Sequence, residues 1–566
     1  MDPLLKVPAK KLLNVNHQTP FRYKRILSCC LIGIIILTSS TYVLDHFDHS
    51  NQTVGPIWKL DKPLSLKPWS GVKVAISQAP MCVQLDAPEI EGHSSEDCLY
   101  MNIFKPHNSA NDPLPILFAI HGGAFELGNS GTFGLHGDRA LKLLKKGAIV
   151  VATNYRLGVY GFASDGSSEL PGNLGYWDQK EALEFISRNA ASFGGDPKRI
   201  TIIGCSAGSA STTALSISPH TREMVGQVLG MSGSTFGAWA LSEVVVDNTN
   251  NLVKAMGQKP NESAKVERLK RARSNEIYMA TKKIGTTHFS QNFGTFIPRL
   301  DGDFFPRDIP QLIRESPVKT VVLGLTSEES LPWTLVPLSN YTCSALVIPL
   351  EERANFSVNN LETLVRQHLV TEENFKDKTT EVQDKILRFY TKSNDYNKNN
   401  VFYLQRYTQI FSDLQFTLPI LFDVLEREAN GWKVYVYKSS YINPALIPST
   451  CPVKKSWHGT DQQYNDVRDD EVDSPADRQI EEIYGDWLVA FVTSGNPSIP
   501  EIKWQPTSSE FPLRYADFLP KPKMKDALFL DRVQFWINMT REYDYDLVRM
   551  MTKTQYKLFN LPYFNS

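Results

Sequence analysis

The sequence lacks an excess of charge, an internal repeat and a flexible linker after residue 60. Lys and Arg number 60 and Asp and Glu number 61, so the formal net charge is only −1. Proteins that bind nucleic acids carry a basic surplus that neutralises phosphates, and no nucleic-acid partner is therefore expected. No period repeats along the 566 residues, and no run rich in Gly and Ser interrupts them after residue 60. The absence of a repeat period excludes a repeat architecture.

The remaining composition is that of an ordinary globular protein. Apolar residues make up 42% of the chain, aromatic residues 11% and charged residues 21%, with 33 Gly and 34 Pro. Such a composition excludes a mostly disordered, collagen-like or coiled-coil chain. It predicts a large folded body and does not indicate its chemistry.

One long apolar run lies near the N-terminus. Residues 26–44 read ILSCCLIGIIILTSSTYVL without a charge, which as a helix would span roughly 30 Å of hydrocarbon. Basic residues precede the run and acidic residues follow it, so the positive-inside rule keeps residues 1–25 in the cytosol. The run is therefore predicted to be an uncleaved signal anchor.

This anchor predicts a single-pass type II membrane protein, with a juxtamembrane linker at residues 45–56 and a lumenal or extracellular domain at residues 57–566. A cleaved signal peptide, which would release a secreted protein, is the alternative. It would be an unusually long leader, and no small-x-small cleavage site follows its apolar core.

The glycosylation sequons and the cysteines are consistent with a domain that lies in the lumen or outside the cell. Five Asn-x-Ser/Thr sequons are candidate glycosylation sites and begin at Asn51, Asn261, Asn340, Asn355 and Asn538. Beyond the apolar run the cysteines are Cys82, Cys98, Cys205, Cys343 and Cys451. Cys205 lies in a motif described below, and the other four could pair in three ways. Cys82 and Cys98 lie close together in a stretch with Pro, Gly and Asp, which favours a disulfide-closed loop between them.

Several short strands are apolar throughout instead of alternating. They lie at residues 115–120, 148–153, 200–203 and 318–325. Strands of this kind are buried on both faces, as in a parallel sheet covered by helices. Helical patterns at 177–191 and 480–492 accompany them, the second between Ser474-Pro475 and Gly495 as start and stop signals. The pattern predicts a large, mostly parallel α/β sheet with helices on both faces and long insertions.

A Gly-x-Ser-x-Gly motif follows the strand at 199–203. In the segment 204–208, GCSAG, small residues flank Ser206, so a sharp turn can project its hydroxyl from the end of the sheet. The helix that follows presents the N–H of Ala207 to developing negative charge. The motif predicts a nucleophilic serine, with a tight structural turn as the alternative.

The sequence around this motif resembles the type-B carboxylesterase and cholinesterase family. Residues 193–208 are similar to the serine signature of the family, and residues 96–104, EDCLYMNIF, to its second signature, with Met101 where a smaller residue is usual. Further family-like blocks stand at 154–158, 172–179, 231–234 and 533–536. The resemblance covers roughly residues 57–540 and implies a single α/β-hydrolase domain.

The resemblance also implies a Ser-Glu-His triad. A serine needs a base that takes its proton, and the base needs an acid that orients it. His458, in the sequence WHGTD, matches the catalytic histidine of the family. Glu329 matches the acid, and its neighbour Glu328 is the alternative. The family usually has Gly after the acid, whereas this chain has Ser330, which leaves the path of that loop open.

The strand at 115–120 runs into the sequence HGGAF. Glycines there let backbone N–H groups approach the oxyanion of a tetrahedral intermediate closely. By the family match, the oxyanion hole consists of the N–H groups of Gly123, Ala124 and Ala207. Ala124 stands where the family often has a third glycine.

Together these features predict a serine carboxylesterase. It would hydrolyse small-molecule or lipid esters through an acyl-enzyme on Ser206, and the mechanism requires neither a metal nor an organic cofactor. A general carboxylesterase is favoured over a cholinesterase, because the loop between Cys82 and Cys98 is short and lacks a Trp for a quaternary ammonium. The alternative from another class is a catalytically silent, neuroligin-like adhesion protein, against which the complete triad argues.

Overall fold

The computed structural model describes residues 41–44, 60–65, 79–84, 94–106, 112–131, 143–257, 265–284, 294–336, 346–392, 398–463 and 474–552. Contacts between residues group Thr41–Ser566 into one compact unit. The fold described below is that of this unit.

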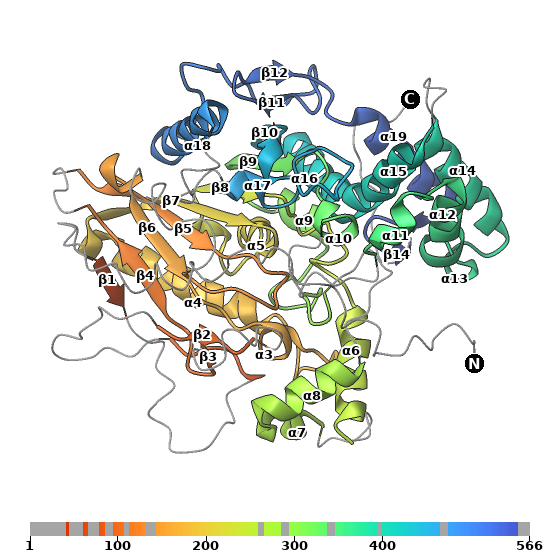
Figure 1. The fold of residues 1–566 in the computed structure, drawn as a ribbon. Helices are drawn as coiled ribbons and strands as arrows, with labels where there is room; N and C mark the ends of the chain where they lie inside the picture. Colours follow the sequence, from red (N-terminus) through yellow and green to blue (C-terminus); the bar gives the residue numbers. More distant parts are fainter. Residues whose placement is uncertain are drawn as a thin grey trace. The chain divides into compact units, whose positions relative to one another are not determined.

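A sheet of ten strands forms the centre of the fold (Figure 1). In spatial order the strands are β1 (Thr41–Leu44), β4 (Met101–Phe104), β6 (Ile149–Thr153), β5 (Leu114–Ile120), β7 (Gly195–Cys205), β8 (Gln227–Met231), β9 (Thr320–Thr326), β10 (Lys433–Ser439), β11 (Tyr515–Phe518) and β12 (Lys523–Lys525). The pairs from β6 to β11 are parallel, whereas β1, β4 and β12 pair antiparallel at the two edges. The predicted mostly parallel sheet is confirmed.

Two small strand pairs lie outside this sheet. One consists of β2 (Met81–Cys82) and β3 (Ser94–Ser95), and the other of β13 (Tyr545–Asp546) and β14 (Met551–Thr552).

Helices fill the connections between the strands. The α-helices are α3 (Gly158–Phe162), α4 (Leu174–Asn189), α5 (Ala207–Leu215), α6 (Val244–Ala255), α7 (Lys265–Arg271), α8 (Ser274–Ile284), α9 (Ile309–Arg314), α10 (Leu331–Thr334), α11 (Leu350–Arg353), α12 (Val358–Thr363), α13 (Glu372–Phe375), α14 (Thr379–Thr391), α15 (Asn400–Ser412), α16 (Leu418–Ala429), α17 (Thr460–Gln463), α18 (Pro475–Ser494) and α19 (Leu530–Tyr543). Short helices of other types are η5 (Ala190–Phe193), η6 (Arg222–Met224), η9 (Lys376–Lys378) and η11 (Pro444–Leu446), with π-helical turns at η8 (Leu364–Leu369) and η10 (Asp413–Thr417).

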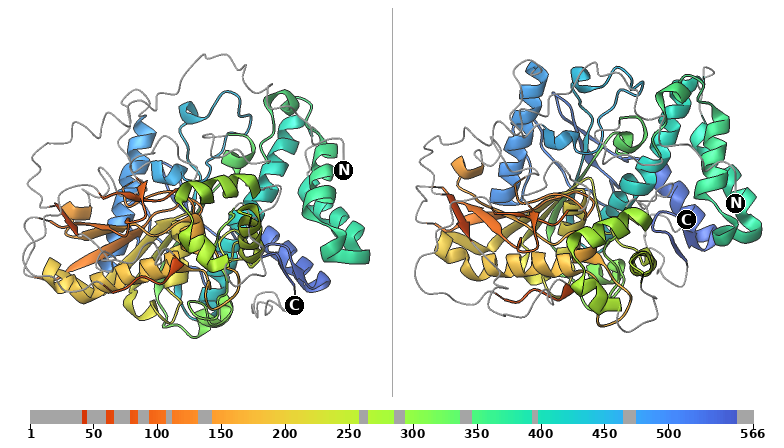
Figure 2. Two further views of the ribbon diagram at one scale, coloured as in Figure 1. Left: turned by 90° about the horizontal axis from the view of Figure 1, so that it is seen from below. Right: turned by 60° about the horizontal axis from the view of Figure 1, so that its bottom comes forward.

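The sheet separates two hydrophobic cores. Along β5, Ile116 and Phe118 belong to one core, whereas Leu117 and Ala119, which point to the other face, belong to the second. The views in Figure 2 show α4 and α18 on opposite sides of the sheet. Burial of both faces explains why the strand sequences are apolar throughout.

The predicted helix boundaries agree closely with the structure at α18. Ser474 and Asp477 form a reciprocal capping box at its start, and Gly495 ends it with a left-handed φ of 72°. The predicted helix at 177–191 corresponds to α4, which lies between β6 and β7 and completes a βαβ unit.

The structure describes only the last four residues of the predicted signal anchor. Within the described part of the chain, no helix is long and apolar enough to cross a membrane. The predicted anchor at 26–44 lies outside the described residues except for Thr41–Leu44, which form β1 and pair antiparallel with β4. These four residues were predicted to be helical and are a strand, which suits the β-branched and aromatic residues Thr41, Tyr42 and Val43.

Candidate active site

Ser206 lies at the tip of a sharp turn between β7 and α5. Its φ of 58° and ψ of −126° are a strained conformation for a residue with a side chain, and strain of this kind clusters at functional sites. A Cβ on Gly204 would lie 2.3 Å from the backbone of Gly208, and one on Gly208 would lie 2.2 Å from the Ile120 carbonyl oxygen. The turn therefore requires both glycines of the motif.

Glu329 and His458 lie together at the ends of β9 and β10. The Nδ1 atom of the His458 ring is 2.9 Å from the Oε2 atom of Glu329. The backbone N–H of His458 also donates to the backbone carbonyl oxygen of Glu329 at 3.2 Å. The other carboxylate oxygen of Glu329 accepts from the Ser232 hydroxyl at 2.8 Å and from the Thr326 N–H at 2.6 Å. The fully buried carboxylate is thus held on both oxygens.

Glu328, the alternative acid, contacts a different element. Its Oε1 atom accepts a hydrogen bond of 3.1 Å from Gln405 on α15, and its Oε2 atom is buried without a partner among the described residues. Burial raises the pKa of Glu328 to about 7. The structure therefore brings Glu329, and not Glu328, to His458.

The residue that departs from the family pattern has an ordinary conformation. Ser330 has a φ of −87° and a ψ of 10°, so the loop does not need a glycine there. The Ser330 hydroxyl donates to the Gln415 side-chain oxygen at 2.8 Å, and the Ser330 N–H donates to the Ser412 hydroxyl at 3.0 Å. These two bonds define the loop path that the sequence left open.

Two aromatic side chains support the histidine. The His458 ring lies 4.5 Å from the Phe416 ring and 5.1 Å from the Trp333 ring, measured between centroids. Phe416 belongs to the π-helical turn η10, and the Trp239 indole N–H donates to the Gln415 carbonyl oxygen at 2.6 Å. Trp239 is fully buried, as a core residue is. The position of Phe416 could not be predicted from the sequence, because a π-turn inside a helical pattern has no clear sequence signal.

The loop that carries two of the oxyanion candidates lies against the serine turn at Gly122. A Cβ on Gly122 would lie only 3.1 Å from the Ser206 Cβ atom. Gly123, Ala124 and Phe125 follow with φ values of 110°, 54° and 63°, three left-handed residues in a row. Ala207 is the first residue of α5, so its N–H has no partner within the helix.

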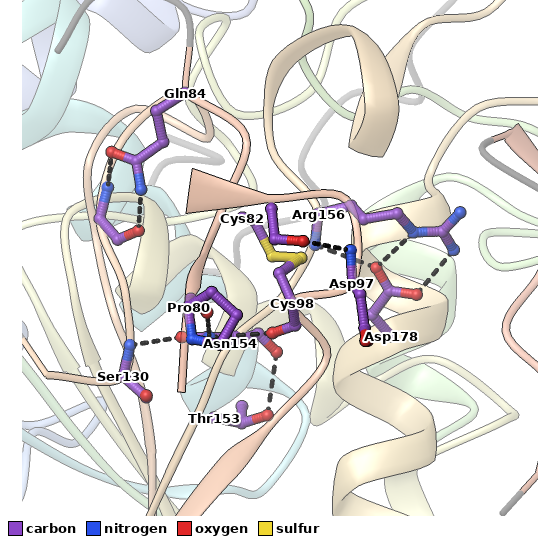
Figure 3. The surroundings of a disulfide bond; sticks show 12 residues. Pro80, Cys82, Gln84, Asp97, Cys98, Ser130, Thr153, Asn154, Arg156 and Asp178 are labelled. Carbon is purple, nitrogen blue, oxygen red and sulfur yellow. Dashed lines mark hydrogen bonds and ion pairs between the residues drawn. A yellow bond between two sulfur atoms is a disulfide. The ribbon is translucent and has the colours of Figure 1, made fainter. Parts of the chain in front are cut away.

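The predicted disulfide between Cys82 and Cys98 is confirmed (Figure 3). Asn154, from one of the family-like blocks, donates to the carbonyl oxygens of Cys98 at 2.9 Å and Pro80 at 3.0 Å. Cys205 and Cys451 are buried and form no disulfide bond in the described part of the chain, and Cys343 lies outside the described residues.

Two of the five sequons lie in the described part of the chain. Asn355 and Asn538 are both exposed, whereas Asn51, Asn261 and Asn340 lie outside it. Among the described residues, no group of three or more His, Cys, Asp or Glu side chains could hold a metal ion.

A parallel sheet that carries a strained serine after β7, an acid after β9 and a histidine after β10 defines an α/β-hydrolase. The model of the carboxylesterase family matches residues 56–536, and the chain belongs to this family. The predicted family and fold class are thereby confirmed.

Several relatives match this chain over most of its length. Gut esterase 1 of Caenorhabditis briggsae is 30% identical over 501 residues, which cover 87% of this chain and 88% of that protein. Esterase cest-33 of Caenorhabditis elegans is 29% identical over 548 residues, which cover 92% and 95%. A carboxylic ester hydrolase of Bombus ignitus is 27% identical over 496 residues, which cover 84% and 86%.

Proposed function

We propose that this protein is a serine carboxylesterase that uses Ser206, Glu329 and His458 as its catalytic triad. The observation that carries the proposal is the 2.9 Å contact between His458 and Glu329. The same acid accepts from Ser232, and the preceding residue, Met231, accepts the backbone N–H of the strained Ser206 at 2.8 Å. The names of the relatives, which are esterases and a carboxylic ester hydrolase, support the same reaction class.

The first step is acylation. With the Nδ1 proton of His458 donated to Glu329, the Nε2 atom is available to take the proton of the Ser206 hydroxyl. The serine oxygen then attacks the ester carbonyl, and the oxyanion accepts hydrogen bonds from the N–H groups of Gly123, Ala124 and Ala207. As the intermediate collapses, the bond to the alcohol breaks and His458 returns its proton to the leaving alcohol.

The second step is deacylation by the same groups. Water loses a proton to His458 and attacks the acyl-enzyme, the oxyanion forms in the same hole, and Ser206 leaves with the proton. The buried Glu329 carboxylate stabilises the imidazolium in both steps. The hydrogen bonds that it accepts from Ser232 and Thr326 keep it oriented.

We place this reaction in the lumen of the secretory pathway or outside the cell. The disulfide between Cys82 and Cys98 and the exposed sequons at Asn355 and Asn538 support that compartment. A glycosidase that removes N-linked glycans should increase the electrophoretic mobility of the cell-expressed protein. An unchanged mobility would contradict this location.

The experiment that tests the esterase is hydrolysis of short p-nitrophenyl esters by the full chain and by Ser206→Ala. We expect turnover by the wild type, no turnover by the variant, and an organophosphonate adduct on Ser206 only in the wild type. Cys205→Ala is the matched control, because it changes the neighbouring buried residue and leaves the hydroxyl in place. No turnover and no adduct in folded wild type would overturn the proposal and favour the adhesion alternative.

A further inference from the structure

The oxyanion loop, residues 121–128, is strained in a way that requires support from outside. Gly123, Ala124 and Phe125 all have positive φ values, which are a strained conformation for the two residues that carry a side chain. Such a conformation persists only when its surroundings impose it. The contacts between this loop and its surroundings therefore determine where the N–H groups of Gly123 and Ala124 point.

The middle of the loop, at Phe125, is packed into the hydrophobic core. The Phe125 side chain is fully buried and lies 5.0 Å from the Phe162 ring, and the Phe125 carbonyl oxygen accepts from the Gly158 N–H at 2.7 Å. The turn itself is closed by the Leu127 N–H, which donates to the Gly123 carbonyl oxygen at 2.9 Å.

The C-terminal end of the loop, Gly128, is held by Gln84, two residues after Cys82. The Gln84 side-chain N–H donates to the Gly128 carbonyl oxygen, and the Gly128 N–H donates back to the Gln84 side-chain oxygen at 3.1 Å, as Figure 3 shows. The Gln84 amide thus pairs with both the backbone N–H and the backbone carbonyl of the buried Gly128.

Gly128 transmits this contact to the start of the loop. A Cβ on Gly128 would lie 2.4 Å from the His121 Nδ1 atom and 2.7 Å from the Gly122 carbonyl oxygen, so the backbones touch directly. Gly122 in turn lies against Ser206. A shift of Gly128 would therefore displace the peptides that precede the oxyanion donors.

The disulfide fixes the segment that carries Gln84. Asn154 binds the carbonyl oxygens of Pro80 and Cys98 on either side of the disulfide, and its own side-chain oxygen accepts from the Ser130 N–H at 2.7 Å. The disulfide segment and the end of the oxyanion loop thus share two independent connections, through Gln84 and through Asn154.

From these contacts we propose that Gln84 is a positioning residue for the oxyanion hole, and that the Cys82–Cys98 disulfide holds Gln84 in place. The inference rests on the proposed esterase function. Oxyanion donors act on the transition state more than on the bound ester, so a misplaced loop lowers kcat and leaves KM unchanged.

The test compares Gln84→Met, which keeps the length of the side chain and removes both hydrogen bonds, with the wild type. Loss of a whole oxyanion donor costs on the order of 100-fold in kcat, and a displaced loop that keeps its donors should cost about tenfold. We expect the affinity for a trifluoromethyl ketone to fall by the same factor. Ser206 adds to this ketone and places an oxyanion in the hole without turnover.

Two further variants test whether the effect on kcat depends on Gln84 and on the disulfide that holds it. Tyr100→Phe is the matched control, because it removes a hydrogen bond to Asp97 next to Cys98 and keeps both Gln84 bonds to Gly128, and it should leave kcat unchanged. In a Cys82→Ser, Cys98→Ser background, Gln84→Met should cost much less than in the wild type, since Gln84 is no longer held. If Gln84→Met does not fold, Gln84→Asn serves instead, because its shorter amide cannot reach both groups of Gly128.

The outcomes separate this inference from the proposed function. Wild type without turnover and without a ketone adduct would overturn both. An active wild type with an equally active, folded Gln84→Met would overturn the positioning role alone. An increased KM with unchanged kcat, or an equal loss in Tyr100→Phe, would also overturn it.

Discussion

Ser232 donates a hydrogen bond of 2.8 Å to the Oε1 atom of Glu329, the carboxylate oxygen that His458 does not contact. Ser232 directly follows β8, has a left-handed φ of 53°, and donates its N–H to the Gly324 carbonyl oxygen on β9 at 2.8 Å. This contact orients the proposed triad acid from the neighbouring strand.

Replacing Ser232 with Ala should therefore weaken catalysis. One hydrogen bond to a charged group is worth about 1.5 kcal/mol, so we expect kcat/KM for a p-nitrophenyl ester to fall about tenfold. Ser234→Ala is the matched control. Ser234 lies two residues after Ser232, and its hydroxyl donates a buried hydrogen bond of 2.9 Å to Asp423. Equal losses of activity in the two variants would contradict an orienting role for Ser232.

The two adjacent glutamates should differ sharply in their effect on turnover. Glu329→Gln removes the charge that stabilises the imidazolium, and kcat should fall by about 10³–10⁴. Glu328→Gln should retain kcat within about threefold, because Glu328 contacts Gln405 and not His458. Steady-state kinetics on both variants measure this difference, and the reverse order would make Glu328 the triad acid.

Glu328 should make the stability of the protein depend on pH. Burial raises its pKa in the folded state from 4.5 to about 7, so the folded protein binds this proton more tightly than the unfolded chain does. Its contribution to stability is full below about pH 4.5 and is lost as the pH rises through about 7.

Glu328→Gln removes that dependence. Relative to the wild type, its free energy of unfolding should rise by up to about 3 kcal/mol between pH 4.5 and pH 7. Urea denaturation of both proteins across this range measures the difference. A difference that does not change with pH would show that Glu328 titrates normally.

Restoring the usual family residue at position 330 should destabilise the protein. Ser330→Gly removes the hydrogen bond to Gln415 and adds backbone freedom at a φ of −87°, for a loss of about 1–2 kcal/mol in unfolding free energy. Ser330→Ala loses the hydrogen bond alone and should cost about 1 kcal/mol. A Ser330→Gly variant as stable as the wild type in urea denaturation would contradict the prediction.

The parts of the fold that depend on local patterns could be predicted from the sequence. The predicted apolar strands match β5, β6 and β9 to within a few residues, whereas for β7 they give only its buried centre. The capping residues of α18 were recognisable because caps are chosen by local chemistry. The strand β1 was mistaken for the end of a helix. An apolar, β-branched segment suits either state until a partner strand such as β4 is known.

The sequence by itself determined the family, the sheet and the candidates for the serine, the histidine and the disulfide, because these depend on motifs and on hydrophobic periodicity. Only the tertiary structure decided that Glu329 rather than Glu328 meets His458, since neighbouring loop residues point in directions that the loop path sets. It also revealed the contacts of Ser232, Phe416 and Gln84. These residues lie far in sequence from the groups that they touch, and no local pattern records such a pairing.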